Sequence, residues 1–361
     1  MSASRRPARA RALLVGFLGI TTSLAAIVGG STAVSASTAG QASVPGVKPV
    51  IQGLIDRQGA PSKGMLPYVH AYVVQANWSD LQPTAFGPIA ANNAIDQAIA
   101  RVRQPDFAKV GMVLKLRIFA GVNAPDWAKT LDGPSIPYVN NQYGGTTVTG
   151  YIGHFWTANF KAAYDDLMTK LAALYDNVPE VRELTFSRCT TIFDEPFVRQ
   201  FGDKNNIANM QAAGYTTAAD EQCISDSFAE QSVWQHTTSD MDFSPMTLIA
   251  TPGTHDLAFT EQMMQLCRST LGARCGIQNN ALSTQKIADK TFGAMYTYMS
   301  KMGPPVIFQT ATASLIGDPT QVLPAGAQYG ANSEEMPKGY PKYSTTLLQQ
   351  TATSLSANPT P

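Results

Sequence analysis

The chain has 361 residues, in which 26 Lys and Arg balance 26 Asp and Glu. Four of the Arg lie in residues 1–36, which contain no acid, so the rest of the chain carries 22 basic against 26 acidic side chains. This slight acidic excess argues against a nucleic-acid-binding protein, which needs a basic face. The hydrophobic content of 44% excludes a disordered chain, and one large barrel domain accounts for the length.

Residues 1–36 have the pattern of a secretory signal peptide. A basic segment at 4–11 precedes an apolar run at 12–28, and small residues at 34–36 suit a cleavage site. The residues after the Arg pair do not match a twin-arginine signal, so we expect Sec export of a secreted, extracellular protein. A retained membrane anchor is the alternative. No later segment reaches 18 apolar residues, so we expect no stable membrane insertion of the mature chain.

The remaining chain divides into three parts by composition. We expect a flexible segment at 37–48, a single domain at 49–352 and a disordered tail at 353–361. Its four cysteines are too few for a disulfide scaffold but enough for two disulfides, which export would favour. Pairing nearest neighbours gives Cys189–Cys223 and Cys267–Cys275, one of three connectivities. Neither Cys nor His shows metal-ligand spacing, so we expect no metal and no cofactor.

Strands and helices alternate along the domain. Strands are expected at 68–77, 113–119, 181–186, 246–250, 276–278, 305–309 and 332–336, from their aliphatic and β-branched residues. Helices are expected at 92–104, 160–175, 259–271, 290–302 and 321–330. This alternation predicts a parallel sheet. Because no Gly-rich phosphate loop follows the first strands, the pattern favours a single-domain (β/α)₈ TIM barrel over a doubly wound sheet.

Polar and aromatic side chains follow the predicted strands. In a barrel, the loops after all strands meet on one face, so these side chains should converge there. Aromatic rings can cover the C–H face of a sugar, and amides can bind its hydroxyl groups. We therefore expect a carbohydrate ligand, bound by Trp78, Asn77, Trp127, Asn123, Asn279 and Gln309.

Several of these segments carry a family resemblance. NWSDLQP at 77–83, KLRIFAGVNAPDWA at 115–128 and the helices at 92–104 and 160–175 resemble strands two to four of the retaining glycoside hydrolase clan with (β/α)₈ barrels. The β-galactosidase-like members are the most similar, with W-x-x-L-x-P after strand two and P-x-W after strand three. The resemblance implies glycosidic bond cleavage and places Glu195, in TTIFDEPF, as the acid/base after strand four.

The chain departs from the clan at two points. Glu195 follows Asp194 instead of the clan's Asn, and the strand expected at 305–309, which corresponds to strand seven of the clan, ends at Gln309 and Thr310 where the clan has its nucleophile Glu. We expect Glu335 to be the second carboxylate, with Glu334 and Asp256 as alternatives. If none of these carboxyl groups lies opposite Glu195, a non-catalytic carbohydrate-binding or cell-envelope barrel is the other interpretation. We expect a monomer.

Overall fold

The computed structural model describes residues 46–140 and 148–361, so the predicted signal peptide and residues 37–45 lie outside the described part. Eight parallel strands close into a barrel in the order β1-β12-β11-β10-β7-β6-β3-β2. The predicted (β/α)₈ fold is thereby confirmed. The barrel strands are β1 (Gly53–Asp56), β2 (Val69–Asn77), β3 (Val113–Phe119), β6 (Val181–Thr185), β7 (Thr238–Asp242), β10 (Cys275–Leu282), β11 (Val306–Thr310) and β12 (Ser333–Met336).

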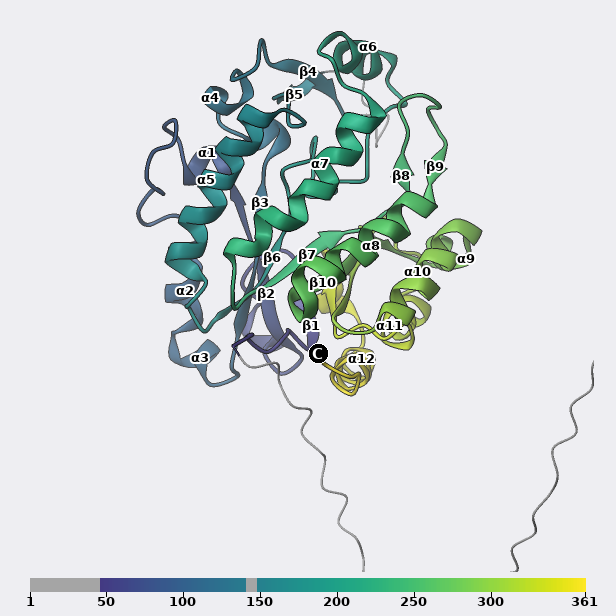
Figure 1. The fold of residues 1–361 in the computed structure, drawn as a ribbon. Helices are drawn as coiled ribbons and strands as arrows, with labels where there is room; N and C mark the ends of the chain where they lie inside the picture. The colour runs from purple at the N-terminus through teal and green to yellow at the C-terminus, as the bar shows by residue number, and fades with distance from the viewer. Residues whose placement is uncertain (1–45, 141–147) are drawn as a thin grey trace, which may run out of the picture. The chain divides into compact units, whose positions relative to one another are not determined.

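Helices surround this barrel, and Figure 1 shows α5, α7, α8 and α10 in front of its strands. The helices are α1 (Trp78–Leu81), α2 (Ala94–Val102), α3 (Pro105–Ala108), α4 (Asp126–Lys129), α5 (Ala158–Tyr175), α6 (Lys204–Ala212), α7 (Thr217–Glu230), α8 (Leu257–Leu271), α9 (Thr284–Ala288), α10 (Lys290–Met302), α11 (Pro319–Gln328) and α12 (Thr345–Ser356). Two short hairpins lie outside the barrel: β4 (Ile136–Val139) with β5 (Val148–Ile152), and β8 (Met246–Thr247) with β9 (His255–Asp256).

The strand side chains alternate between two different environments. Outward residues such as Leu114, Leu116 and Ile118 of β3 join the large apolar core between the strands and the helices. Inward residues form two layers inside the barrel. One is a small apolar cluster around Ile55 and Val73, and the next consists of charged side chains around Lys115. This period of two decides which residues of each strand can reach the mouth of the barrel.

The fifth barrel strand is not where the sequence places it. We expected a strand at 246–250, but β7 occupies Thr238–Asp242, and only Met246–Thr247 form part of the small outer hairpin. The sequence of Thr238–Asp242 is polar and contains two acids, Asp240 and Asp242. Both point into the barrel and are buried. An inward carboxylate with a buried partner is compatible with a barrel strand, whereas a hydrophobicity pattern does not detect it.

The carboxyl terminus is held against the barrel and is not the disordered tail expected at 353–361. Residues 353–356 continue α12, and Leu355 is fully buried. Beyond the helix, Asn358 donates hydrogen bonds to the carbonyl oxygens of Ala327 and Ala331, at 2.9 and 2.7 Å. The start of the domain is also fixed, because Lys48 donates to the carbonyl oxygen of Val181 at 2.7 Å.

Two disulfides join Cys189 to Cys223 and Cys267 to Cys275, which is the pairing expected from the sequence. The first attaches the loop after β6 to α7, and the second attaches α8 to the start of β10. Within residues 46–140 and 148–361, no helix combines the length and the hydropathy needed to cross a bilayer.

The adjacent acids of β12 face opposite sides of the barrel wall. Glu335 points inward, while Glu334 points outward against α11, where a Cβ on Gly326 would overlap its carboxyl group. Glu334 is fully buried, and neither of its carboxyl oxygens has a hydrogen-bond partner among the described residues. Burial therefore raises the pKa of Glu334 well above its usual range.

We predict that Glu334→Met stabilises the protein at neutral pH. The folded pKa of Glu334 lies above its unfolded value, so its contribution to stability is fully present below the unfolded pKa of about 4.5 and is lost as pH rises, by about 1.4 kcal/mol per pH unit. Urea unfolding between pH 4.5 and 7.5 should show a shallower loss in the variant than in the wild type. Glu261→Met on α8 is the control, and equal slopes in Glu334→Met and wild type would contradict the prediction.

Candidate functional site

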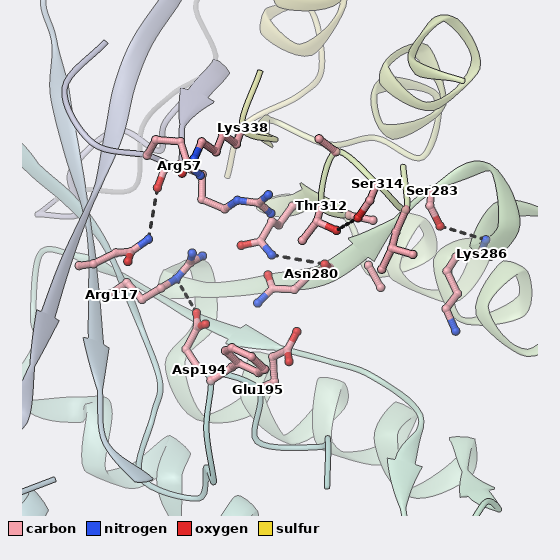
Figure 2. A pocket seen from close by; sticks show the side chains of 18 of the residues that line it. Arg57, Arg117, Asp194, Glu195, Asn280, Ser283, Lys286, Thr312, Ser314 and Lys338 are labelled. Atoms are coloured by element: carbon pink, nitrogen blue, oxygen red, sulfur yellow. Dashed lines mark hydrogen bonds and ion pairs between the residues drawn. The ribbon is translucent and has the colours of Figure 1, made fainter. Parts of the chain in front are cut away.

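A cavity of about 740 Å³ opens at the carboxyl ends of the barrel strands (Figure 2). This is the face where barrel enzymes place their chemistry. Among the described residues, its wall contains four cationic and two acidic side chains, with amides, hydroxyls and two phenyl rings. The lining residues are Arg57, Gln58, Gln75, Arg117, Phe119, Phe193, Asp194, Glu195, Asn280, Ala281, Ser283, Gln285, Lys286, Gln309, Ala311, Thr312, Ala313, Ser314, Leu315 and Lys338.

Five of the eight barrel strands supply the polar floor of this cavity, each through a side chain at or near its carboxyl end. The residues are Arg57 after β1, Gln75 on β2, Arg117 on β3, Asn280 on β10 and Gln309 on β11. Two of the amides are oriented by backbone carbonyls. Gln75 donates to the carbonyl oxygen of Arg57 at 3.3 Å, and Gln309 donates to that of Asn280 at 3.4 Å.

One layer below, Lys115 sits in the barrel interior with no solvent exposure. Its Nζ lies 2.9 Å from Asp240, 3.3 Å from Glu335 and 3.4 Å from Glu183. One ammonium cannot balance three carboxylates, so the layer must retain protons. Burial and the neighbouring Asp240 accordingly raise the pKa of Glu183 to about 8.

Arg117 connects this buried layer to the cavity. Its Nη2 lies 2.8 Å from both carboxyl oxygens of Glu335, and its Nε lies 2.6 Å from Asp194. Burial alone would raise the pKa of Glu335, but Arg117 and Lys115 outweigh it and hold that pKa below its usual range. Glu335 is thus an ionised group behind Arg117, is fully buried and does not line the cavity.

The loop after β6 carries Asp194 and Glu195, and it is fixed on several sides. Beside the disulfide to α7, Arg199 lies 2.6 Å from Asp220 of that helix and donates to the carbonyl oxygen of Cys189 at 2.9 Å. Gly121 packs so closely against this loop that a Cβ there would overlap the carbonyl oxygen of Thr191, and its φ of +53° also requires glycine. The loop is therefore a rigid support for both acids.

Glu195, the residue predicted to be the acid/base, is partly exposed and lines the cavity. Desolvation and the neighbouring Asp194 raise the pKa of Glu195 to about 7, against the opposing effect of Arg117 and Arg57. A third carboxyl group, that of Asp242 at the end of β7, is buried nearby. Burial, Glu195 and Asp194 raise the pKa of Asp242 well above its usual range. The cluster therefore holds exchangeable protons beside an ion-paired carboxylate.

The two tryptophans expected to bind sugar lie elsewhere. Trp78 is fully buried, because it occupies an outward position after β2 and packs edge-on against Phe160 and Tyr164 of α5. Trp127 covers Trp78 from outside, with ring centroids 5.8 Å apart, and its indole N–H donates to the carbonyl oxygen of Gln82. Neither ring lines the cavity, so the expectation that they form its sugar platforms is wrong.

Of the other four residues expected to bind sugar, only one lines the cavity. Gln309 lines it, whereas Asn77, Asn123 and Asn279 do not. Asn279 is a fully buried outward residue of β10 that accepts a hydrogen bond from Tyr296 on α10 at 3.0 Å. Its inward neighbour Asn280 takes the place in the cavity wall.

The alternative second carboxylates are also accounted for. Glu334 faces the helices, and Asp256 accepts a hydrogen bond from the Phe259 N–H as the N-cap of α8, so neither lines the cavity.

Sequence reasoning missed Arg57, Arg117 and Lys115. A signal for two of them was present, since the segment VLKLRIF alternates aliphatic and basic residues in a strand that helices must cover. In a barrel, that pattern indicates a charged interior.

No cluster of three or more His, Cys, Asp or Glu side chains suited to a metal ion occurs in residues 46–140 and 148–361. The cavity can act chemically through its own proton-carrying group, Glu195, its ion-paired carboxylate, Asp194, and the guanidinium of Arg117. Phe119 and Phe193 are the aromatic residues available to an organic ligand.

We predict that Asp194→Asn lowers the pKa of Glu195. The substitution removes a neighbouring negative charge and one of the two carboxylates that pair with Arg117, and both changes favour the ionised form of Glu195. Titration of ¹³C-labelled Glu carboxyl groups by NMR should show a group with a pKa of about 7 that moves toward 4.5 in the variant. Asp256→Asn, outside the cavity, should leave this titration unchanged. An unchanged pKa in Asp194→Asn would refute the coupling.

No protein-family model matches the sequence, and no curated protein matches it. A comparison with solved structures does find matches. Endo-glycoceramidase II from Rhodococcus sp., as its lactosyl-enzyme intermediate, matches at 15% identity and a TM-score of 0.45, over 84% of this chain and 78% of that chain. Its ganglioside GM3 complex matches at 13% and 0.46 over the same shares. The β-galactosidase from Rahnella sp. R3 matches at 12% and 0.42, over 85% of this chain and 56% of that chain. At these values the likeness assigns neither activity nor site residues to this chain.

Proposed function

We propose that the protein is a secreted glycoside hydrolase that cleaves a glycosidic bond in this cavity, with Glu195 as the proton donor. The observation that carries the proposal is the carboxyl group of Glu195, which reaches the cavity with a pKa of about 7, beside a carboxylate that is ion-paired with Arg117. Glycosidases use such a pair, in which one group protonates the leaving oxygen and the other remains ionised.

Each group has a distinct part in the proposed reaction. Glu195 donates its proton to the glycosidic oxygen as the bond to the anomeric carbon breaks. Positive charge develops on the ring at that point and is opposed by the carboxylate of Asp194, the ion-paired acid of the cavity wall. A water molecule then adds to the anomeric carbon and gives a proton to the Glu195 carboxylate, so a bond to the water oxygen replaces the broken bond and the acid is restored. Glu335, expected as the second carboxylate, instead holds Arg117 in place from below and is a positioning residue in this proposal.

The rest of the cavity suits a sugar. The amides of Gln75, Asn280 and Gln309 and the hydroxyl groups of Thr312 and Ser314 offer donors and acceptors to sugar hydroxyls. Phe119 and Phe193 take the role that we expected of Trp78 and Trp127. The two disulfides support export, because such bonds persist mainly outside the cytoplasm.

One observation favours a second candidate, a carbohydrate-binding barrel without turnover. Both carboxylates that line the cavity come from the same loop, and β11, the seventh barrel strand, ends at Gln309 and Thr310 with no acid. A glycosidase of the expected clan places its two acids on opposite sides of the scissile bond. Binding and hydrolysis therefore have to be measured separately.

We predict that Glu195→Gln retains sugar binding and lowers kcat by on the order of 10²-fold or more, because it removes the proton donor and keeps the side-chain shape. The measurement is a hydrolysis screen over 4-nitrophenyl glycosides and oligosaccharides, with binding followed by calorimetry on any substrate found. Glu261→Gln is the matched control. Undiminished turnover in Glu195→Gln would refute the assignment, and binding without turnover in the wild type would favour the second candidate.

We also predict that kcat/KM falls above pH 7. A general acid must be protonated, so activity should decrease tenfold per pH unit once pH exceeds the pKa of about 7 of Glu195. In Asp194→Asn the decrease of kcat/KM should begin at a lower pH, by the same amount as the pKa of Glu195 falls in the NMR titration. If the pKa of Glu195 falls but the decrease of kcat/KM begins at the same pH as in the wild type, another group is the acid.

A further inference from the structure

Arg57 is a buried cation without an acid partner. Its side chain follows β1 and lines the cavity, and the residue is 8% exposed. The guanidinium makes one hydrogen bond within the described residues, from Nη1 to the carbonyl oxygen of Thr310 at 2.7 Å. No Asp or Glu oxygen lies within 4 Å of it, and every Asp and Glu of the chain is in the described part. Most of its N–H donors therefore remain available.

Other arginines of the chain that are buried or partly buried have more partners than Arg57. Arg117, Arg188 and Arg199 each form an ion pair with a carboxylate at 2.6 to 2.9 Å. Arg268 has no acid, but its guanidinium donates to three carbonyl oxygens. A buried charge with so few partners costs stability unless a ligand compensates it. Burial accordingly lowers the pKa of Arg57, against the attraction of Glu335, Asp194 and Glu195, none of which forms an ion pair with it.

The surrounding wall is also positive. Lys338 is exposed beside Arg57, and Figure 2 shows both on the side of the cavity away from Asp194 and Glu195. Lys286 lies on a further part of the wall, with its Nζ 3.7 Å from the Phe292 ring centroid and no ion pair. Arg117 is neutralised by Asp194 and Glu335, so three unpaired cations face a cavity whose remaining acid, Glu195, is largely protonated below pH 7.

We propose that the cavity binds an acidic glycan, with a carboxylate or sulfate group of the sugar held by Arg57 and Lys338 across the cavity from Glu195. The inference rests on the proposed function, because it gives the substrate class of the same site. An arginine fork offers paired N–H donors to either anion, and Lys338 adds a point charge. The shared chemistry is a monovalent oxyanion on a sugar ring, and its carboxylate and sulfate forms can be separated experimentally.

The test compares matched charged and neutral oligosaccharides by titration calorimetry at 50 and 500 mM NaCl. Hexagalacturonate is compared with its methyl ester, and a sulfated carrageenan tetrasaccharide with its desulfated form. We expect at least one charged member to bind ten times or more tightly than its neutral match at low salt, with the difference reduced at high salt. A carboxylate-only or sulfate-only preference supports the proposal and identifies the form of the anion.

Substitutions test which residues cause the preference for the charged oligosaccharide. Arg57→Gln should abolish the preference for the charged member, so that the charged and neutral members bind this variant with affinities within about twofold of each other. Lys338→Gln, at an exposed position that cannot compromise folding, should reduce the preference several-fold. Arg103→Gln removes the same charge from a surface pair with Glu180 and is the control, with no expected change. Circular dichroism checks that each variant is folded.

Equal binding of charged and neutral oligosaccharides, no binding of either, or a preference that survives both substitutions would overturn the proposal. These results are distinguishable from failure of the proposed function. If neutral sugars are hydrolysed and Glu195→Gln abolishes that turnover, the glycosidase proposal stands and only the acidic substrate is excluded.

Discussion

The pairing of Arg117 with both Asp194 and Glu335 is the interaction on which the rest of the site depends. It joins a strand, a loop and the far wall of the barrel through one guanidinium, with contacts of 2.6 to 2.8 Å. A buried ion pair of this kind contributes little net stability, but removing one partner leaves an uncompensated charge. The pair therefore fixes where Asp194 lies, and through the electrostatics of Asp194 it sets the proton affinity of Glu195.

Below this pair, the barrel interior contains more acids than bases. Lys115 is shared by three carboxyl groups, so protons are retained there, and Glu183 keeps its proton to a pKa of about 8. Burial and the neighbouring acids Glu195 and Asp194 raise the pKa of Asp242 as well. Arg57 differs from these groups, because it is a buried cation without an ion-paired acid and lies above an interior that contains more acids than bases. This contrast is the reason for assigning it to a ligand.

Much of the architecture could be predicted from local sequence patterns. Strand β3 and helix α10 have the bounds expected from their hydrophobic periodicity, and the nearest-neighbour cysteine pairing is the one observed. The seventh barrel strand also ends at Gln309 and Thr310 as expected. The bounds of strands and helices follow from the hydrophobic pattern of residues close together in the chain. The disulfides follow from the oxidising environment expected of an exported protein.

The tertiary structure decided which side chains enter the cavity. Both faces of a barrel strand are buried, so the sequence shows where a strand ends but not which of two adjacent residues points inward. Asn280 lines the cavity where Asn279 was expected, Trp78 packs outward into the helices, and Glu334 and Glu335 face opposite ways. The strand at Thr238–Asp242 was not predicted because its sequence is polar, and Asp240 meets its partner Lys115 only across the closed barrel. The sequence alone determined the barrel and the position of Glu195 in its fourth loop, while the residues around Glu195 were set by contacts between strands far apart in the chain.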